Sequence, residues 1–217
     1  MTQDELQRLF PAVVVVEVAT EADEDDSLLY PAEAALTGAM IPARKREFAA
    51  GRNAARRALA RLGFHDATLP RRPSSHDVLW PEGSGGSISH TRGLRAVACV
   101  RSSDLMSVGI DVEQAGPLGD EIIDAVCRPE ELLALASVPA PLPSDWPRLI
   151  FAMKEAAYKA LYPVTRQLLT FHDVRLDVNV PLQSYRAEVL DQPVAGLQLS
   201  GRFIWNDVYV AAGATLF

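Results

Sequence analysis

Hydrophobic residues recur along the chain at two spacings, and these spacings predict different elements. Over residues 146–161 they repeat every three to four positions, which is the pattern of a helix packed against a core. A second helix is predicted over about 43–62, because Pro42 suits its first turn and Gly63 suits its end.

Alternating residues and short apolar runs predict strands. The expected strands cover 12–18, 94–100, 105–113, 174–180, 185–190 and 202–211, with short helices at 122–127 and 129–136 and a proline-rich loop at 137–147. Both halves therefore combine helices with successive short strands, which favours an α+β fold with antiparallel sheets. We expect the division between the halves near residues 105–109.

Composition narrows the class of protein. The chain has 217 residues and 48% hydrophobic content, enough for one large domain or two small ones. It has no apolar segment long enough for a membrane span, and its acidic N-terminus lacks the basic start and apolar run of a signal peptide, so we expect a cytoplasmic protein. Cys99 and Cys127 match no metal-ligand spacing and are expected to stay reduced.

Charge is distributed unevenly. The net charge of -7 argues against general nucleic-acid binding. Residues 2–33 carry nine acids against one base, whereas residues 42–72 carry nine bases against two acids. On the second predicted helix, Arg44, Arg52 and Arg56 recur with Phe48 every four residues and form one basic ridge. This segment is a candidate polyanion site.

The segment "SVGIDVE" places two carboxylates on one face of a strand. Val108, Ile110 and Val112 alternate with Gly109, Asp111 and Glu113, so the apolar side chains face the core and the acids face the other way. Residues two apart on a strand lie about 6.6 Å apart, so both acids can approach one hard cation such as Mg2+. By itself, the pattern is more typical of an exposed strand face that carries acids by chance.

Two further segments carry candidate polar groups. In "GSISH", Ser89 and His90 are groups that can bind a phosphate. The alternative interpretation of this segment is a Gly/Ser turn that ends in a capping or core histidine. In "FAMKEAAYK", Glu155 and Lys159 share a helix face with Phe151 and Tyr158. A surface ion pair is the plainer interpretation of that spacing. The three segments together favour a site for a cation and a phosphate.

Together these residues resemble the 4'-phosphopantetheinyl transferases of the longer, monomeric type. The family pattern G-[IV]-D-x-E, followed by [FW]-x-x-K-E-x-x-x-K, matches "GIDVE" and "FAMKEAAYK" position for position, and S-x-[ST]-H matches "SISH". Upstream, "RKREFAAGRNAARRAL" is similar to the family's arginine-rich helix. The resemblance runs from about Arg44 to Asp173.

The resemblance implies a fold and a reaction. The fold would be a pseudo-dimer of two similar α/β subdomains with antiparallel sheets, here 1–106 and 107–217, with coenzyme A between them. The reaction would move the phosphopantetheine arm of coenzyme A to a serine of an apo acyl or peptidyl carrier protein and release adenosine 3',5'-bisphosphate. Siderophore or polyketide pathways use such enzymes. The protein would act as a monomer, without nucleic acid or membrane partners.

The resemblance also implies residue roles. Asp111, Glu113 and Glu155 would hold Mg2+ or Mn2+, Glu155 would be the general base, and Lys159 with Lys154 would bind the pyrophosphate. His90, Ser89, Arg44, Arg52 and Arg72 would bind the phosphates and adenine side of coenzyme A. Arg71 also suits the basic position, and Arg72 is preferred on its spacing to Trp80. Phe151, Tyr158 and Leu168 would line the path of the pantetheine arm or the carrier.

Two other functions remain open at this point. A Mg2+-dependent phosphohydrolase acting on a coenzyme A-like pyrophosphate would use the same acids with water as the acceptor. A non-catalytic module that binds coenzyme A or a carrier is the second alternative, although it would not need all three carboxylates.

Overall fold

The computed structural model describes residues 1–72, 75, 77–136, 146–190 and 197–217. Its helices and strands are α1 (Gln3–Gln7), β1 (Val15–Val18), α2 (Pro31–Ala34), α3 (Pro42–Arg61), β2 (Ser84–Thr91), β3 (Leu94–Arg101), β4 (Ser107–Gln114), α4 (Asp120–Val126), α5 (Pro129–Ala136), α6 (Trp146–Thr165), β5 (Val174–Asn179), β6 (Ser184–Val189), β7 (Gln198–Trp205) and β8 (Tyr209–Leu216). Most of the predicted proline-rich loop, at 137–145, lies outside the described residues.

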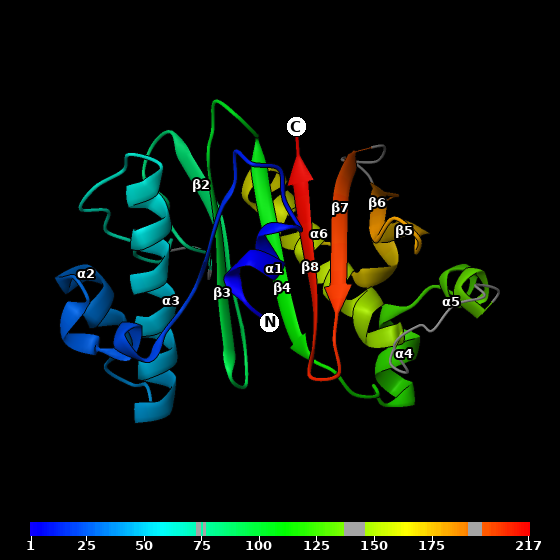
Figure 1. Cartoon of the computed structure of the whole chain (residues 1–217), viewed down its shortest axis with the longest axis horizontal. Coiled ribbons are helices and arrows are strands. Elements are labelled where there is room, and N and C mark those ends of the chain that lie inside the picture. Colours follow the sequence, from blue (N-terminus) through cyan, green and yellow to red (C-terminus); the bar gives the residue numbers. More distant parts are fainter. Residues whose placement is uncertain (73–74, 76, 137–145, 191–196) are drawn as a thin grey trace.

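The strands form two antiparallel sheets. One has the order β1-β3-β2 and the other the order β4-β8-β7-β6-β5, so the sheets divide the chain between β3 and β4. Figure 1 shows α3 beside the smaller sheet and α6 behind the larger one. The predicted α+β class with antiparallel sheets is confirmed.

Three predicted elements differ from the observed ones. The segment containing "GSISH" is strand β2, paired with β3 from Ser84 to Thr91, rather than a turn. The strand expected at 202–211 is a hairpin, because the Asn206 side chain accepts the N–H groups of Val208 and Tyr209 and reverses the chain. β1 is shorter than its apolar run, since pairing with β3 begins only at Val15. A strand partner therefore decides the first and third of these elements, and a side-chain turn decides the second.

β4 is covered on both faces. On one face Val108, Ile110 and Val112 are fully buried in a core with residues of α1, β1 and β3. On the other face a Cβ atom added to Gly109 would lie 1.9 Å from the Ala156 carbonyl oxygen of α6. The absence of a side chain at Gly109 therefore lets α6 approach β4 directly, on the face that carries the acids.

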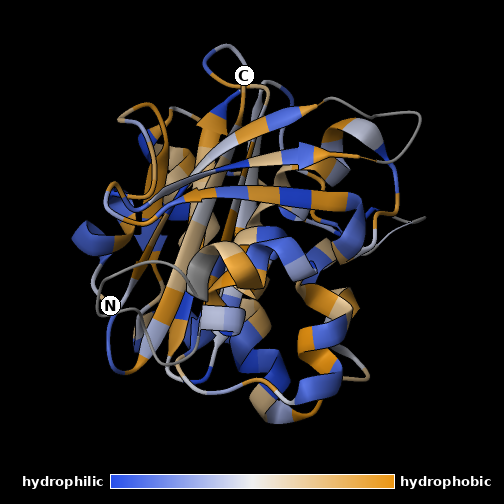
Figure 2. Ribbon diagram, turned by 90° about the vertical axis from the view of Figure 1, so that its right-hand side faces the viewer, coloured by the Kyte–Doolittle hydropathy of each residue, from blue (hydrophilic) through white to orange (hydrophobic). Residues whose placement is uncertain are grey.

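Strands β5 and β7 of the larger sheet show the two-residue period of side-chain burial. β5 and β7 alternate buried and exposed residues, and Figure 2 shows alternating hydrophobic and hydrophilic colours along the strands nearest the viewer.

None of the helices in the described part of the chain is both long and apolar enough to cross a membrane.

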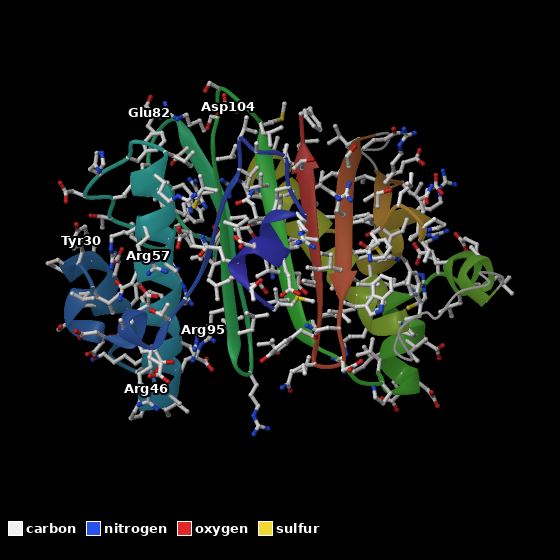
Figure 3. The ribbon with its side chains drawn as sticks, in the orientation of Figure 1. Tyr30, Arg46, Arg57, Glu82, Arg95 and Asp104 are labelled. Carbon is white, nitrogen blue, oxygen red and sulfur yellow. The ribbon has the colours of Figure 1, made fainter. Side chains whose placement is uncertain are left out.

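The acidic N-terminal segment lies against the basic helix α3. Ion pairs join Lys45 to Asp26, Arg46 to Glu24, Arg56 to Glu33, Arg57 to Asp23 and Glu17, and Arg61 to Glu17. Figure 3 shows Arg57 and Arg46 along α3, with Tyr30 near the level of Arg57 and Arg46 at the lower end of the helix. Much of the basic charge of α3 is therefore neutralised within the chain, including Arg56 of the predicted ridge.

The contact at Gly109 predicts a large stability effect. Gly109→Ala should destabilise the fold by about 3 kcal/mol or more, because the new methyl group meets the α6 backbone rather than a movable side chain. Gly85→Ala is the matched strand control, since a Cβ there meets nothing within 4 Å. Urea unfolding measures both. Equal stability of the two variants would contradict the close contact.

Candidate active site

The candidate site lies where β2, β4 and α6 meet. A cavity of about 180 Å³ is lined by Ile88, Ser89, His90, Asp111, Glu113, Phe151, Glu155 and Lys159. These residues come from the three segments that the sequence singled out. The fold therefore brings together side chains that are up to 71 positions apart, from Ile88 to Lys159.

Asp111 is the most enclosed carboxylate of the site. It is only 3% exposed, and its Oδ1 accepts hydrogen bonds from Ser89 Oγ at 2.8 Å and Lys159 Nζ at 2.6 Å. Its Oδ2 is buried and has no hydrogen-bond partner among the described residues. A buried carboxylate oxygen without a donor is costly unless a bound group satisfies it.

Glu155 and Glu113 stand near Asp111 from two directions. Burial, and then the charge of Asp111, raise the pKa of Glu113 above its ordinary value. Burial likewise raises the pKa of Glu155, with Lys159 opposing and Asp111 reinforcing the rise. Three acids that repel one another in this way favour a cation between them.

The three carboxylates do not yet converge. Within residues 1–72, 75, 77–136, 146–190 and 197–217, no three Asp, Glu, His or Cys side chains are placed so that they could hold one metal ion. The prediction that Asp111, Glu113 and Glu155 meet around one ion is therefore not met by these side-chain positions. The Lys159 ammonium instead pairs with Asp111, at 2.6 Å.

Arg148 also positions part of the site, a role that the sequence analysis did not predict. Its Nε and terminal nitrogen donate to the carbonyl oxygens of Gly116 and Pro117, and its other nitrogen lies 3.7 Å from Glu113. It therefore ties the loop after β4 to the first turns of α6. A lone arginine on a helix has no sequence signal for such a role.

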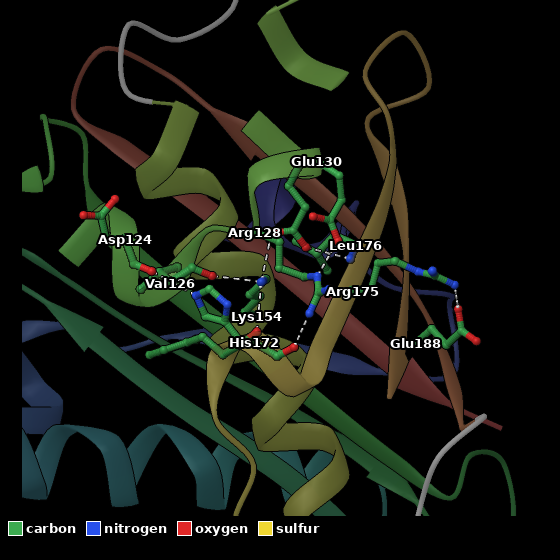
Figure 4. Close-up of polar contacts among 11 residues, drawn as sticks. Asp124, Val126, Arg128, Glu130, Lys154, His172, Arg175, Leu176 and Glu188 are labelled. Carbon is green, nitrogen blue, oxygen red and sulfur yellow. Dashed lines mark hydrogen bonds and ion pairs between the residues drawn. The ribbon is translucent and has the colours of Figure 1, made fainter. Parts of the chain in front are cut away.

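Lys154 does not line the polar cavity, so its position does not support the predicted role in pyrophosphate binding. Its side chain is 1% exposed, and its ammonium forms an ion pair of 2.9 Å with Glu131 and donates to the carbonyl oxygens of Val126 and Phe171. Figure 4 shows it enclosed between the chain at Val126 and the chain at His172. Lys154 and Lys159 are five residues apart, so they point about 140° away from each other around the helix.

Glu131 completes this buried pair and was also missed. Its carboxylate accepts the N–H groups of Arg128 and Leu176 as well as the Lys154 ammonium. The pair joins α6 to α5 and β5 directly beside Glu155. Burial lowers the pKa of Lys154, and the charge of Glu131 opposes that shift.

Basic groups lie on the α3 side of the cavity. An Arg44 nitrogen contacts Nε2 of His90 at 2.5 Å, so that ring nitrogen accepts. Partial burial and the Arg44 charge lower the pKa of His90, which favours its neutral form. Arg52 stacks 4.5 Å above the Phe48 ring, and burial lowers its pKa to about 10, so it stays charged at neutral pH.

Arg71, rather than Arg72, joins this basic group. The Arg71 guanidinium lies 5.8 Å from the centre of the same Phe48 ring, close enough to Arg52 to affect its pKa. Arg72 instead lies 3.6 Å from Asp77, which also pairs with Arg166 at 2.7 Å. These positions favour Arg71 over Arg72 for the predicted basic position, because Arg72 already has an ion-pair partner in Asp77.

An apolar chamber adjoins the polar cavity. It has a volume of about 580 Å³ and shares Glu155 and Lys159 with the smaller cavity, and Tyr158, Tyr162 and Leu168 lie on its wall. A third cavity, of about 240 Å³, also borders Tyr158 and is lined by Leu169 and Phe171. Phe151 lines the polar cavity rather than the chamber.

Carboxylates, a lysine and a histidine between two antiparallel sheets form a site suited to an enzyme acting on phosphoryl groups. Residues 32–100 match the 4'-phosphopantetheinyl transferase N-terminal domain, and residues 107–201 match the 4'-phosphopantetheinyl transferase superfamily. Among similar proteins, 4'-phosphopantetheinyl transferase Svp of Streptomyces mobaraensis is 40% identical over 87% of this chain and 78% of its own length.

Two further relatives agree. 4'-Phosphopantetheinyl transferase PptT of Mycobacterium tuberculosis is 35% identical over 67% of this chain and 63% of its own length. Enterobactin synthase component D of Salmonella typhimurium is 37% identical over 54% of this chain and 48% of its own length. The chain belongs to the 4'-phosphopantetheinyl transferase family, of the longer type, which confirms the resemblance and the enzyme class.

The buried pair predicts a double-mutant signature. Lys154→Met should cost about 3–5 kcal/mol of unfolding free energy, because Glu131 is then buried without a counter-charge. Glu131→Gln in the same protein should recover part of that loss. Urea unfolding of wild type, both single variants and the double variant gives the coupling energy. Additive effects would contradict a structural pair.

Proposed function

We propose that this protein transfers the 4'-phosphopantetheine arm of coenzyme A to a serine of an apo carrier protein, in a Mg2+-dependent reaction that releases adenosine 3',5'-bisphosphate. The observation that carries the proposal is Asp111, whose buried Oδ2 lacks a partner among the described residues while Lys159 holds Oδ1. Glu113, Glu155 and His90 line the same cavity. Membership of the family supports the transferase class.

The carboxylate set fits a hard divalent cation. Asp111, Glu113 and Glu155 supply only oxygen ligands, and Mg2+ completes its shell with water and substrate phosphates. Side-chain rotation of Glu155 and Glu113 toward Asp111 would bring the acids together. A bound Mg2+ or Mn2+ would supply charge stabilisation at the pyrophosphate oxygens.

On the protein side, Lys159 would stabilise negative charge and Glu155 would accept a proton. Lys159 would bind the pyrophosphate and stabilise the leaving group, because its side chain is 26% exposed and borders the cavity. Glu155, whose pKa is raised by burial, is suited to accept the proton of the carrier serine, directly or through a water.

The basic group would bind the far end of coenzyme A. His90 borders the cavity and contacts Arg44, while Arg52 and Arg71 share the ring of Phe48, one turn further along α3. Arginine donates two parallel hydrogen bonds to a phosphate, so this cluster suits the 3'-phosphate. The apolar chamber beside Tyr158 and Leu168 suits the pantetheine arm, whose surface is mostly apolar.

The remaining features complete the proposal. Residues 1–106 and 107–217 would be the two subdomains, the enzyme would act as a cytoplasmic monomer, and the partners would be acyl or peptidyl carrier proteins. The similarity to an enterobactin synthase component suggests a siderophore carrier as one substrate to test. With a net charge of -7, general attraction to an acidic carrier is weak, so docking would depend on a local patch.

Removing a site carboxylate should stop transfer. Asp111→Asn and Glu155→Gln should each lower the rate of carrier modification by about 10²–10³-fold, because charge stabilisation or proton transfer is lost. Mass spectrometry of an apo carrier incubated with coenzyme A and Mg2+ measures the gain of the phosphopantetheine mass. An unmodified carrier together with free hydrolysis products would instead support the phosphohydrolase.

The arginine pair allows a matched test of the 3'-phosphate site. Arg71→Ala should raise the KM for coenzyme A by about 10-fold or more, because a charge-assisted contact is worth about 1.5–3 kcal/mol. Arg72→Ala, whose native partner is Asp77, should change it little. With 3'-dephospho-coenzyme A the two variants should behave alike. A larger effect of Arg72→Ala would restore the original assignment.

A further inference from the structure

The two sheets are joined at β2 and β4 by serine side chains. β2 and β4 are edge strands of different sheets and are not paired as a ladder. The Ile110 N–H instead donates to Ser87 Oγ at 3.1 Å, and the Val112 N–H donates to Ser89 Oγ at 3.2 Å. Both serines are buried, so each hydroxyl satisfies a main-chain donor that would otherwise lack a partner.

Ser89 differs from Ser87 in one respect. Its hydroxyl also contacts Asp111 Oδ1 at 2.8 Å and Lys159 Nζ at 3.3 Å. Of its three partners, the Val112 N–H and the Lys159 ammonium are donors only, so the hydroxyl hydrogen points to Asp111. Among the described residues, the Ser87 hydroxyl contacts only the Ile110 main chain, whose carbonyl oxygen lies at 3.5 Å. Ser89 therefore has a fixed orientation and fixes a carboxylate in turn.

These contacts also determine the environment of Oδ2, the other carboxylate oxygen of Asp111. Ser89 and Lys159 both bind Oδ1, which leaves Oδ2 as the oxygen without a donor among the described residues. In the proposed reaction Lys159 would also bind a phosphate, whereas the Ser89 hydroxyl is held in place by its contact with the Val112 N–H group. Ser89 is then the group that keeps the Asp111 rotamer during the reaction.

We infer that Ser89 is a positioning residue for Asp111, rather than a ligand of coenzyme A, and that it presents Oδ2 to the catalytic cation. The inference rests on the proposed function in its use of a cation. It gives the two serines of "SISH" separate roles: Ser87 joins the sheets only, and Ser89 joins them and orients the carboxylate.

The two serines provide a matched pair of variants. Ser87→Ala and Ser89→Ala each remove one acceptor for a β4 N–H group, so both should lower the temperature of thermal unfolding, and Ser89→Ala should lower it more because Asp111 also loses a donor. Only Ser89→Ala loses the donor to Asp111. It should lower the kcat of carrier modification by about 10- to 100-fold relative to Ser87→Ala, with little change in the KM for coenzyme A. Ser89→Thr, which keeps the hydroxyl, should retain most of the activity.

A binding measurement without turnover tests the same point. Electron paramagnetic resonance of the full chain titrated with Mn2+ gives the Kd for the ion alone. Ser89→Ala should raise that Kd by about 10-fold, and Ser87→Ala should leave it near the wild-type value. Equal Mn2+ affinity in the two alanine variants would overturn the inference, as would a raised KM for coenzyme A with unchanged Mn2+ affinity.

The test separates this inference from the proposed function. If wild-type protein binds Mn2+ but modifies no carrier, the proposed reaction is wrong while the comparison of Ser87→Ala with Ser89→Ala still decides the role of Ser89. If wild-type protein modifies the carrier and both alanine variants do so equally well, the reaction stands and the positioning role is wrong.

Discussion

The approach of α6 to β4 at Gly109 is the contact on which the site depends. Because Gly109 has no side chain, the Ala156 carbonyl and the Ala160 backbone nitrogen lie directly over the strand. The helix is then close enough for the Lys159 ammonium to reach the carboxylate of Asp111 two residues along β4. A larger residue at 109 would move Lys159 and Glu155 together away from the strand acids.

The short distance between α6 and β4 also lowers the energetic cost of burying Asp111. Asp111 is nearly buried, and a buried carboxylate without a counter-charge is costly. Lys159 supplies that counter-charge from α6, while Ser89 supplies a neutral donor from β2. The lysine is thus part of the stability of the free protein and, in the proposed reaction, would also bind the phosphate.

The two halves of the chain are not independent units. α1, β1 and β3 share one apolar core with β4 and with Ala211 of β8, so the first residues of the chain pack against the last strand. The serine contacts between β2 and β4 join the sheets at their edges. A site built across this junction keeps its geometry only while both halves are packed together.

Much of the candidate site was open to prediction from local pattern. The alternation in "SVGIDVE" determined that Asp111 and Glu113 share a face opposite Val108 and Ile110, because side chains on a strand point alternately to its two faces. The spacing of Glu155 and Lys159 determined that they share a helix face, since four residues nearly complete a turn. The fold class followed from the order of helices and strands.

Partners distant in the sequence decided the rest. Lys154 and Lys159 are equivalent basic residues in the motif, but in the fold Lys154 pairs with Glu131 and Lys159 pairs with Asp111. Arg71 and Arg72 are adjacent, and only the folded chain shows that Asp77 compensates the second. A sequence determines which face a side chain occupies through the local period of its helix or strand. The group that meets it there depends on how the elements pack, which local periodicity does not contain.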